Sequence, residues 1–391
     1  MEQNINTYTI KLVKSAITDK KDNDLTKEKF TQEILQEIYH ISQQQDIQHL
    51  VFQGLYNNGL IDDSSELYKK FLNKRMSLLL KSEQQKFELD RIKSLFEKLQ
   101  VPFIPLKGSV LRKYYPEEWM RTSCDIDILI KPENIEKCVN ALTQDFSFTV
   151  KKIGEYDISL YSPGKVHLEL HFGFMESMFK ASKSLDKIWD SVKQVSTGRY
   201  EYIMPDDVFY YHQIVHMAKH FEYGGCGLRF FIDIWILNHS SDFIKTTESE
   251  RLLAEVGLVK FEHVMLQVSE VWFTDKTHND LTRRVENYIM SSGLYGNSQN
   301  LMATKQIKSG GKKKYAFSRV FLSYEKLLEL YPSLYGKKFL IPWYQMRRWF
   351  SIIFSGRFKL SYKELSLNSK ISESRKNSIA DLFKDLGFSE K

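Results

Sequence analysis

Apolar side chains recur every three to four residues in the first hundred positions. In "TKEKFTQEILQEIYHI" (26–41) this spacing places Phe30, Ile34 and Ile38 on one side of a helix, with charged and polar residues between them. The same spacing continues between charges through residues 64–99. We therefore predict a helical N-terminal region over residues 1–99.

The pattern changes at "VPFIPL" (101–106), a short apolar run with two prolines. Prolines are tolerated at the edge of a sheet, so this run predicts an edge or first strand. Gly108 is predicted to end it at a tight turn, and Ser109 to cap a short helix that runs to Tyr115. "DIDILI" (125–130) then predicts a strand rich in β-branched residues.

Further strands follow after a helix that begins at Pro132. We predict strands around 147–153 and 157–162, and "SPG" (162–164) turns the chain into a strand at "KVHLELHF" (165–172). This order predicts a mixed α+β fold, in which a small mixed β-sheet over 100–205 is flanked by helical regions on both sides.

Helices return after Pro205. Residues 206–292 predict a helical domain, and the glycine-rich, polar stretch 293–314 predicts a flexible linker. Residues 315–391 predict a helical C-terminal region that is both basic and aromatic. One predicted helix there carries an apolar face beside two arginines; these residues are Trp343, Met346, Phe350, Ile353, Arg347 and Arg348.

Composition limits the classes of protein to consider. The chain of 391 residues is 42% hydrophobic and 27% charged, which is typical of a globular protein. The first residues contain no secretory signal, and no apolar run reaches the roughly 18 residues of a membrane span, so we expect a cytoplasmic protein without a transmembrane segment. Three widely spaced cysteines argue against a disulfide framework or a zinc ribbon.

Two acids interrupt the apolar strand at 125–130. Side chains at positions i and i+2 of a strand point to the same side, so Asp125 and Asp127 are predicted neighbours while the isoleucines between them face the other side. Two adjacent carboxylates repel each other unless a cation lies between them. Because their oxygens are hard ligands, this pair predicts a site for Mg²⁺ or Mn²⁺.

A third acid lies on a later strand. In "VHLELHF" the apolar residues alternate with His167, Glu169 and His171, which therefore share the opposite side. If this strand pairs with 125–130, three carboxylates converge, and such a set can hold two metal ions for in-line displacement at phosphorus.

A phosphate-binding turn is predicted just upstream of the acids. Gly108 allows close approach to the backbone, Ser109 offers a hydroxyl and an N–H, and Lys107 adds a positive charge. Arg121 is a further candidate, either as a phosphate ligand or as an ion-pair partner of the acids. The formal net charge of +7 is a modest excess that fits phosphate-bearing ligands, whereas the low number of basic runs near the site argues against long nucleic acid.

A Gly-Ser pair, then Asp-x-Asp on a strand, then a lone acid on a later strand resembles the nucleotidyltransferase superfamily of DNA polymerase beta and the aminoglycoside nucleotidyltransferases. More narrowly, "LKG", "RTSCDIDILI" and "LELH" are similar to the bacterial family of uncharacterised nucleotidyltransferases, over roughly residues 100–240. Fifteen residues separate Ser109 from Asp125, a spacing that fits the narrower family.

The resemblance implies a small mixed sheet that carries the site and a helical domain that closes over it. It also implies that Gly108 and Ser109 hold the triphosphate, that Asp125 and Asp127 bind both metals, and that Glu169 completes one metal site and acts as base or orients the base. The expected activity is metal-dependent transfer of a nucleoside monophosphate from an NTP such as ATP to an unidentified acceptor, with release of pyrophosphate. The acceptor is expected to be a small molecule or a protein.

Three alternatives accompany this prediction. A catalytically silent protein of the same fold could bind a partner through its basic and aromatic C-terminal region. A zinc hydrolase could use His167, Glu169 and His171 as ligands. A group of polar residues on the later helices could either face the metals and bind the nucleotide or the acceptor, or form a polar network between two packed helices; these are His216, His220, Arg229 and Asp233.

Overall fold

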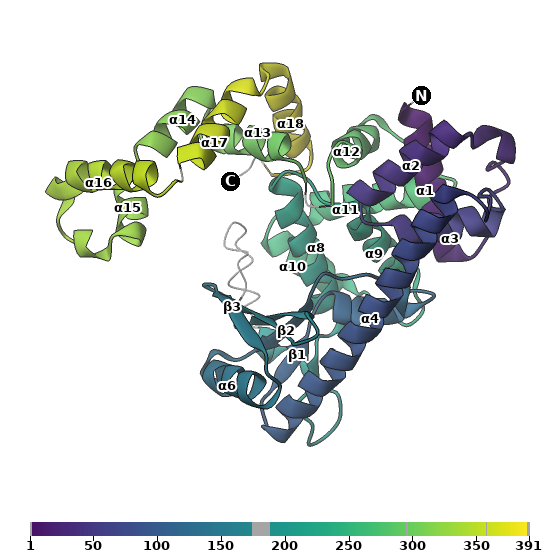
Figure 1. Cartoon of the computed structure of the whole chain (residues 1–391), viewed down its shortest axis with the longest axis horizontal. Coiled ribbons are helices and arrows are strands. Elements are labelled where there is room, and N and C mark those ends of the chain that lie inside the picture. Colours follow the sequence, from purple (N-terminus) through teal and green to yellow (C-terminus); the bar gives the residue numbers. More distant parts are fainter. Residues whose placement is uncertain (1, 174–187, 295, 357, 389–391) are drawn as a thin grey trace. The chain divides into compact units, whose positions relative to one another are not determined.

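The computed structural model describes residues 2–173, 188–294, 296–356 and 358–388 (Figure 1). The chain forms two compact units. The first comprises Met1–Lys219 and Gly227–Met290, and the second comprises His220–Cys226 and Ser291–Lys391. The predicted helical N-terminal region and the predicted sheet both lie in the first unit.

The N-terminal region is helical, as predicted. Its helices are α1 (Glu2–Thr18), α2 (Gln32–Gln44), α3 (Gln48–Asn58) and α4 (Glu66–Lys98). The side-chain oxygens of Thr31 and Ser65 accept hydrogen bonds from the first turns of α2 and α4, which satisfies backbone N–H groups that a helix leaves unpaired at its start.

Five strands form the mixed sheet that the sequence predicted. In chain order these are β1 (Phe103–Pro105), β2 (Ile126–Ile130), β3 (Thr149–Ile153), β4 (Asp157–Tyr161) and β5 (His167–His171). Their order across the sheet is β1-β2-β5-β4-β3, so β1 lies at an edge, as its prolines indicated. Strands β2 and β5 are parallel, and every other pair is antiparallel.

The sheet has one apolar face. Ile126, Ile128 and Ile130 of β2 lie beside the leucines of β5, and all are nearly inaccessible to solvent. They pack against α4 and against α6 (Ile135–Asp145), through residues such as Phe96 and Leu142 (Figure 1). Burial of this face fixes the register of the strands, because a shift by one residue would turn the apolar side chains to solvent. It also leaves the alternate side chains of β2 and β5 on the other face.

The remaining elements of the first unit follow the sheet. Short strands β6 (Lys193–Gln194) and β7 (Tyr202–Ile203) pair with each other, and the helices are α8 (Asp206–Glu222), α9 (Leu228–His239), α10 (Thr247–Glu255), α11 (Val259–Phe273) and α12 (Asp280–Met290). The last residues of α8, from His220, belong to the second unit. Within the described ranges no helix is both long enough and apolar enough to cross a membrane.

The second unit is entirely helical in its described residues. Its helices are α13 (Ser298–Lys308), α14 (Lys312–Val320), α15 (Tyr324–Leu330), α16 (Ile341–Phe354), α17 (Phe358–Lys370) and α18 (Glu373–Asp385). The prediction of a linker at 293–314 is wrong, because α13 occupies most of that stretch. The side chain of Asn297 caps α13, and Met302 and Ala303 are buried, so its polar residues lie around a packed helix.

Candidate active site

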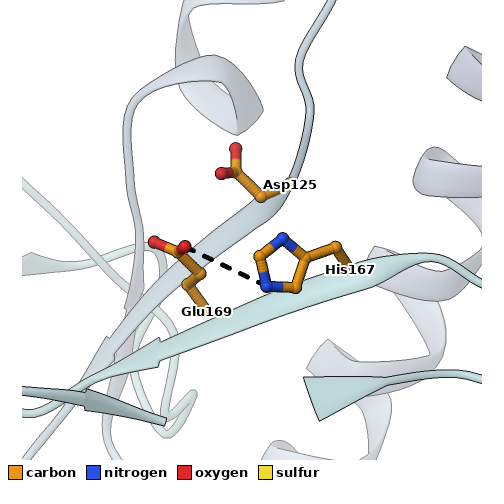
Figure 2. A group of neighbouring side chains, drawn as sticks. All are labelled: Asp125, His167 and Glu169. Carbon is orange, nitrogen blue, oxygen red and sulfur yellow. Dashed lines mark ion pairs between the residues drawn. The ribbon is translucent and has the colours of Figure 1, made fainter. Parts of the chain in front are cut away.

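The acids predicted from the strand pattern lie on one face of the sheet. The register of the parallel pair β2 and β5 sets Asp127 directly beside Glu169. Asp125 immediately precedes β2, two residues before Asp127, and its side chain lies near those of Glu169 and His167 (Figure 2). Since the other face of both strands is buried in the core, the polar side chains can only gather here.

The possible ligand atoms form two overlapping groups. Asp125, His167 and Glu169 make one group, and Asp127, Glu169 and His171 make the other, with the ligand atoms of each group within 4.8 Å of one another. Glu169 belongs to both. Among the residues described, neither group contains both histidines, so the three ligands of the alternative zinc hydrolase do not meet around one point.

A lysine and a histidine pair with Asp127, which is only 3% exposed. The Lys107 Nζ and the His171 Nε2 lie 2.8 and 2.7 Å from its Oδ1. Burial alone would raise the pKa of Asp127, but the lysine and the histidine outweigh burial and hold that pKa below its ordinary value. Burial likewise opposes the charge on Lys107, yet the carboxylate raises the pKa of its ammonium group. Asp127 is therefore charged and its charge is balanced.

Glu169 has the opposite electrostatic environment. Its partial burial and the nearby carboxylates of Asp127 and Asp125 raise its pKa. The nearest basic side chains are those of the two histidines: the Nε2 atoms of His171 and His167 lie 3.6 and 4.0 Å from its oxygens. The His167 Nε2 also lies 2.7 Å from the Ser159 hydroxyl on β4. Compared with Asp127, Glu169 thus has a negative charge that its surroundings compensate less.

A turn lies where the sequence predicted one, but the position of Ser109 differs from the prediction. Lys107, not Gly108, has the positive φ of 42°, and a helical turn, α5 (Gly108–Leu111), follows it. Ser109 does not cap this helix; it lies inside it, and its N–H donates to the carbonyl of Leu106 at 3.1 Å. Its hydroxyl has no hydrogen-bond partner among the described residues.

Gly108 is needed for close packing. A Cβ atom at this position would lie 3.1 Å from the hydroxyl oxygen of Ser123 and 3.2 Å from its Cβ. The same hydroxyl donates to the backbone carbonyl of Asp125 at 2.8 Å. The glycine therefore lets the turn at 107–108 approach the segment that leads into β2, and so brings Lys107 close to the acids.

Arg121 is held in a buried ion pair and does not pair with the three acids. Its guanidinium makes a two-pronged contact with Asp233 of α9, with distances of 2.6 and 2.9 Å. The Tyr115 hydroxyl donates to the same carboxylate at 2.6 Å. Arg229, one turn earlier on α9, donates to the carbonyl of Thr122 at 2.6 Å. These contacts fasten residues 115–122 to α9, so Asp233 and Arg229 lie in the network that positions the link between turn and strand.

The sequence interpretation overlooked His212 on α8. It is 1% exposed, and burial and the nearby charge of Lys107 lower its pKa to about 3, so it is neutral. Its ring stacks on that of His216, which contacts Phe230. Residues 212, 216 and 220 are each four apart, and this spacing could have indicated that the histidines share one side of the helix. His220 belongs to the second unit.

Comparison with known proteins gives one match. A family model described as an uncharacterised nucleotidyltransferase matches residues 32–274, which is more than half of the chain and includes the N-terminal helices from α2, the sheet, and the helices up to the end of α11. No curated protein and no solved structure matches the chain.

Proposed function

The chain belongs to the uncharacterised nucleotidyltransferase family and is a nucleotidyltransferase, and we propose that it transfers a nucleoside monophosphate from an NTP to a small-molecule or protein acceptor. The observation that carries this proposal is the pairing of β2 with β5, which brings Asp127 beside Glu169 with Asp125 two residues away. In the proposed reaction an acceptor oxygen forms a bond to the α-phosphorus, the bond from that phosphorus to the bridging oxygen breaks, and pyrophosphate leaves.

The donor set fits divalent cations. Carboxylate oxygens suit Mg²⁺ or Mn²⁺, and the two overlapping groups of possible ligands share Glu169, as expected of a site for two ions. We propose that Asp125, Asp127 and Glu169 hold these ions. When bound, the ions would neutralise phosphate charge and polarise the acceptor oxygen. His171 then serves to orient Asp127, because its Nε2 already bonds that carboxylate, whereas the Nε2 of His167 is held by the Ser159 hydroxyl.

The neighbouring residues have roles that follow from their charges. We also propose that Glu169 accepts the proton of the acceptor hydroxyl or orients the base that does so. Lys107 neutralises Asp127 in the metal-free protein and can turn to the triphosphate when a cation replaces it. We assign the open hydroxyl of Ser109 to the same triphosphate, with Gly108 allowing its approach. Arg121 contributes through its pair with Asp233, by positioning the turn.

Substitution of the paired aspartates tests the proposal directly. Isothermal titration with each of the four NTPs and Mg²⁺ should show binding heat for the unmodified chain and none for the Asp125→Asn/Asp127→Asn variant. Pyrophosphate release, followed with a mixture of hydroxyl-bearing acceptors, should fall by at least about a hundredfold, the usual effect of losing a stabiliser of transition-state charge. Repeating both assays with Mn²⁺ and Zn²⁺ identifies the preferred ion.

A matched control excludes a general effect of replacing carboxylates. Asp63→Asn and Glu136→Gln make the same chemical changes at exposed positions outside the sheet, and should leave binding and release unchanged. Metal-dependent NTP binding that survives the double substitution would show that the site is wrongly assigned. Binding without any turnover would favour a catalytically silent protein.

A further inference from the structure

The second unit exposes an unusual number of large apolar side chains. On α16 the side chains of Trp343, Phe350 and Phe354 are 60%, 60% and 81% exposed, and Met346 and Ile353 are also exposed. Their spacing of three, four, three and one residues places all five on one side of the helix. We refer to these five side chains as the aromatic face.

Exposed apolar side chains also occur in the segments that precede and follow α16 in the sequence. Neighbouring segments add side chains that are at least half exposed; these are Tyr335, Phe339, Phe358, Leu360 and Tyr362. By contrast, the apolar core beneath α15 and α16 has only three buried members among the described residues, Leu327, Leu334 and Tyr344. More apolar surface thus faces outward than is needed to hold these helices together, and a large exposed apolar surface marks a binding site.

The same segment is strongly basic. Residues 331–363 contain seven basic side chains and no acidic one, so their formal charge of +7 equals that of the entire chain. The basic residues are Lys337, Lys338, Arg347, Arg348, Arg357, Lys359 and Lys363. Arg347 follows Met346 directly and is exposed beside the aromatic face. The partner of this surface must therefore be both apolar and negatively charged.

From this combination we propose that the aromatic face of α16, with the basic residues around it, docks on the surface of an anionic lipid bilayer. A helix with Trp and Phe on one side and Lys or Arg at its margins lies in the interface, with its apolar side among the acyl chains and its cations at the phosphate level. Tryptophan and tyrosine are also the side chains that favour this depth.

Two other occupants fit less well. Single-stranded nucleic acid is also anionic and stacks on aromatic rings, but Met346 and Ile353, which form one side of the face, offer no ring for a base. A second copy of the chain would bring two surfaces of the same positive charge together, which is repulsive. A lipid surface satisfies both the aliphatic side chains and the charge.

Vesicle sedimentation of the full-length chain tests the proposal. We expect binding to vesicles of phosphatidylcholine with phosphatidylglycerol, loss of that binding at high salt, and none to phosphatidylcholine alone. Trp343→Ser/Phe350→Ser/Phe354→Ser should abolish binding. Lys359→Gln/Lys363→Gln should weaken it by roughly 25-fold, since each basic residue at an anionic surface contributes about fivefold.

Controls in the first unit match these changes. Tyr56→Ser/Phe87→Ser removes two side chains that are each 63% exposed, and Lys151→Gln/Lys152→Gln removes two exposed charges; both variants should bind like the unmodified chain. Trp343→Phe should retain binding but reduce the quenching of tryptophan fluorescence by brominated lipid, which reports insertion of this residue.

Three results would overturn the proposal. The first is equal binding to neutral and anionic vesicles, and the second is binding that is unchanged by the triple serine substitution. The third is absence of vesicle binding together with an aromatic face that is required for another interaction. That interaction would be binding of a single-stranded oligonucleotide, or a dimer seen by light scattering. None of these results depends on nucleotidyl transfer, so a failure of the membrane proposal would leave the proposed activity untouched, and the reverse also holds.

Discussion

Lys107→Met tests whether the ammonium of Lys107 takes the place of a cation at Asp127. The two groups lie 2.8 Å apart, and their side chains are 20% and 3% exposed. Methionine keeps the apolar part of the side chain and removes the charge. It is preferable to glycine, because residue 107 has a φ of 42°, where glycine would relieve roughly 1 kcal/mol of backbone strain and obscure the result.

The expected cost follows from the contacts that remain. Removing one partner of a buried ion pair costs about 3–5 kcal/mol, because the other charge stays buried and unpaired. The hydrogen bond from His171 to Asp127 persists, and such a charge-assisted bond offsets about 1.5–3 kcal/mol. We therefore expect the metal-free Lys107→Met variant to lose roughly 2 kcal/mol in the stability of the first unit.

Amide exchange followed by mass spectrometry measures this loss locally. Peptides from β2 and β5 report the free energy of opening of the sheet without a contribution from the second unit. In chelator their protection should fall about thirtyfold, which corresponds to 2 kcal/mol. Saturating Mg²⁺ should restore most of the lost protection. It should stabilise the variant more than the unmodified chain, because in the variant the ion does not have to displace an ammonium group.

A double substitution provides the control. In an Asp127→Asn background the same change at Lys107 should cost less than about 0.5 kcal/mol, because the charge that required a partner is gone. An equal loss in both backgrounds would show that the pair does not stabilise the sheet. A loss that Mg²⁺ leaves unchanged would refute the idea that the lysine stands where a cation binds.

Three further predictions concern single groups of the first unit. Glu169→Gln should reduce transfer at least about a hundredfold, yet it should stabilise the metal-free protein. Because the pKa of Glu169 is raised in the folded protein, its ionisation destabilises the fold as pH rises. The greater stability of the variant in urea denaturation should therefore grow with pH and vanish in acid. Asp233→Asn should cost about 3–5 kcal/mol in the same assay because it leaves Arg121 buried without its counter-ion, whereas Glu248→Gln, which disrupts an exposed pair, should cost less than about 1 kcal/mol. His49 is 1% exposed, and burial lowers its pKa from 6.5 to about 4, so the free energy of unfolding should fall by roughly 3 kcal/mol as pH falls from 6.5 to 4. His49→Gln should remove this pH dependence. A pH profile of denaturation that the substitution leaves unchanged would contradict the role given to His49.

The strands and the group of acids could be predicted because both depend on local patterns. Alternation of apolar and polar residues located β2 and β5, and the period of two placed Asp125 with Asp127 and His167 with Glu169. Only the pairing of the two strands was conditional, and the buried face of isoleucines and leucines makes that pairing favourable.

The partners of the charged residues could not be predicted in the same way. Arg121 and Asp233 are 112 residues apart in sequence, and nothing in either local pattern selects the other. Likewise, a sequence with a glycine after a lysine suggests that the glycine takes the positive φ, whereas Gly108 is required for its missing Cβ and Lys107 carries the strain. Such choices are made by tertiary packing, which outweighs local preference.

The charges around the acids indicate where a first cation would enter. Asp127 already has two positive or hydrogen-bonding partners, and a cation that binds there must displace Lys107. Glu169 has no such partner closer than 3.6 Å, and its neighbouring carboxylates make its ionisation unfavourable. A cation at Glu169 removes that repulsion without breaking an existing ion pair, so we expect the first ion to bind between Glu169 and Asp125. A second ion then has to compete with Lys107, which would be released toward an incoming triphosphate. If binding is ordered in this way, Lys107→Met should strengthen the weaker of two metal-binding steps in calorimetry and leave the stronger one unchanged.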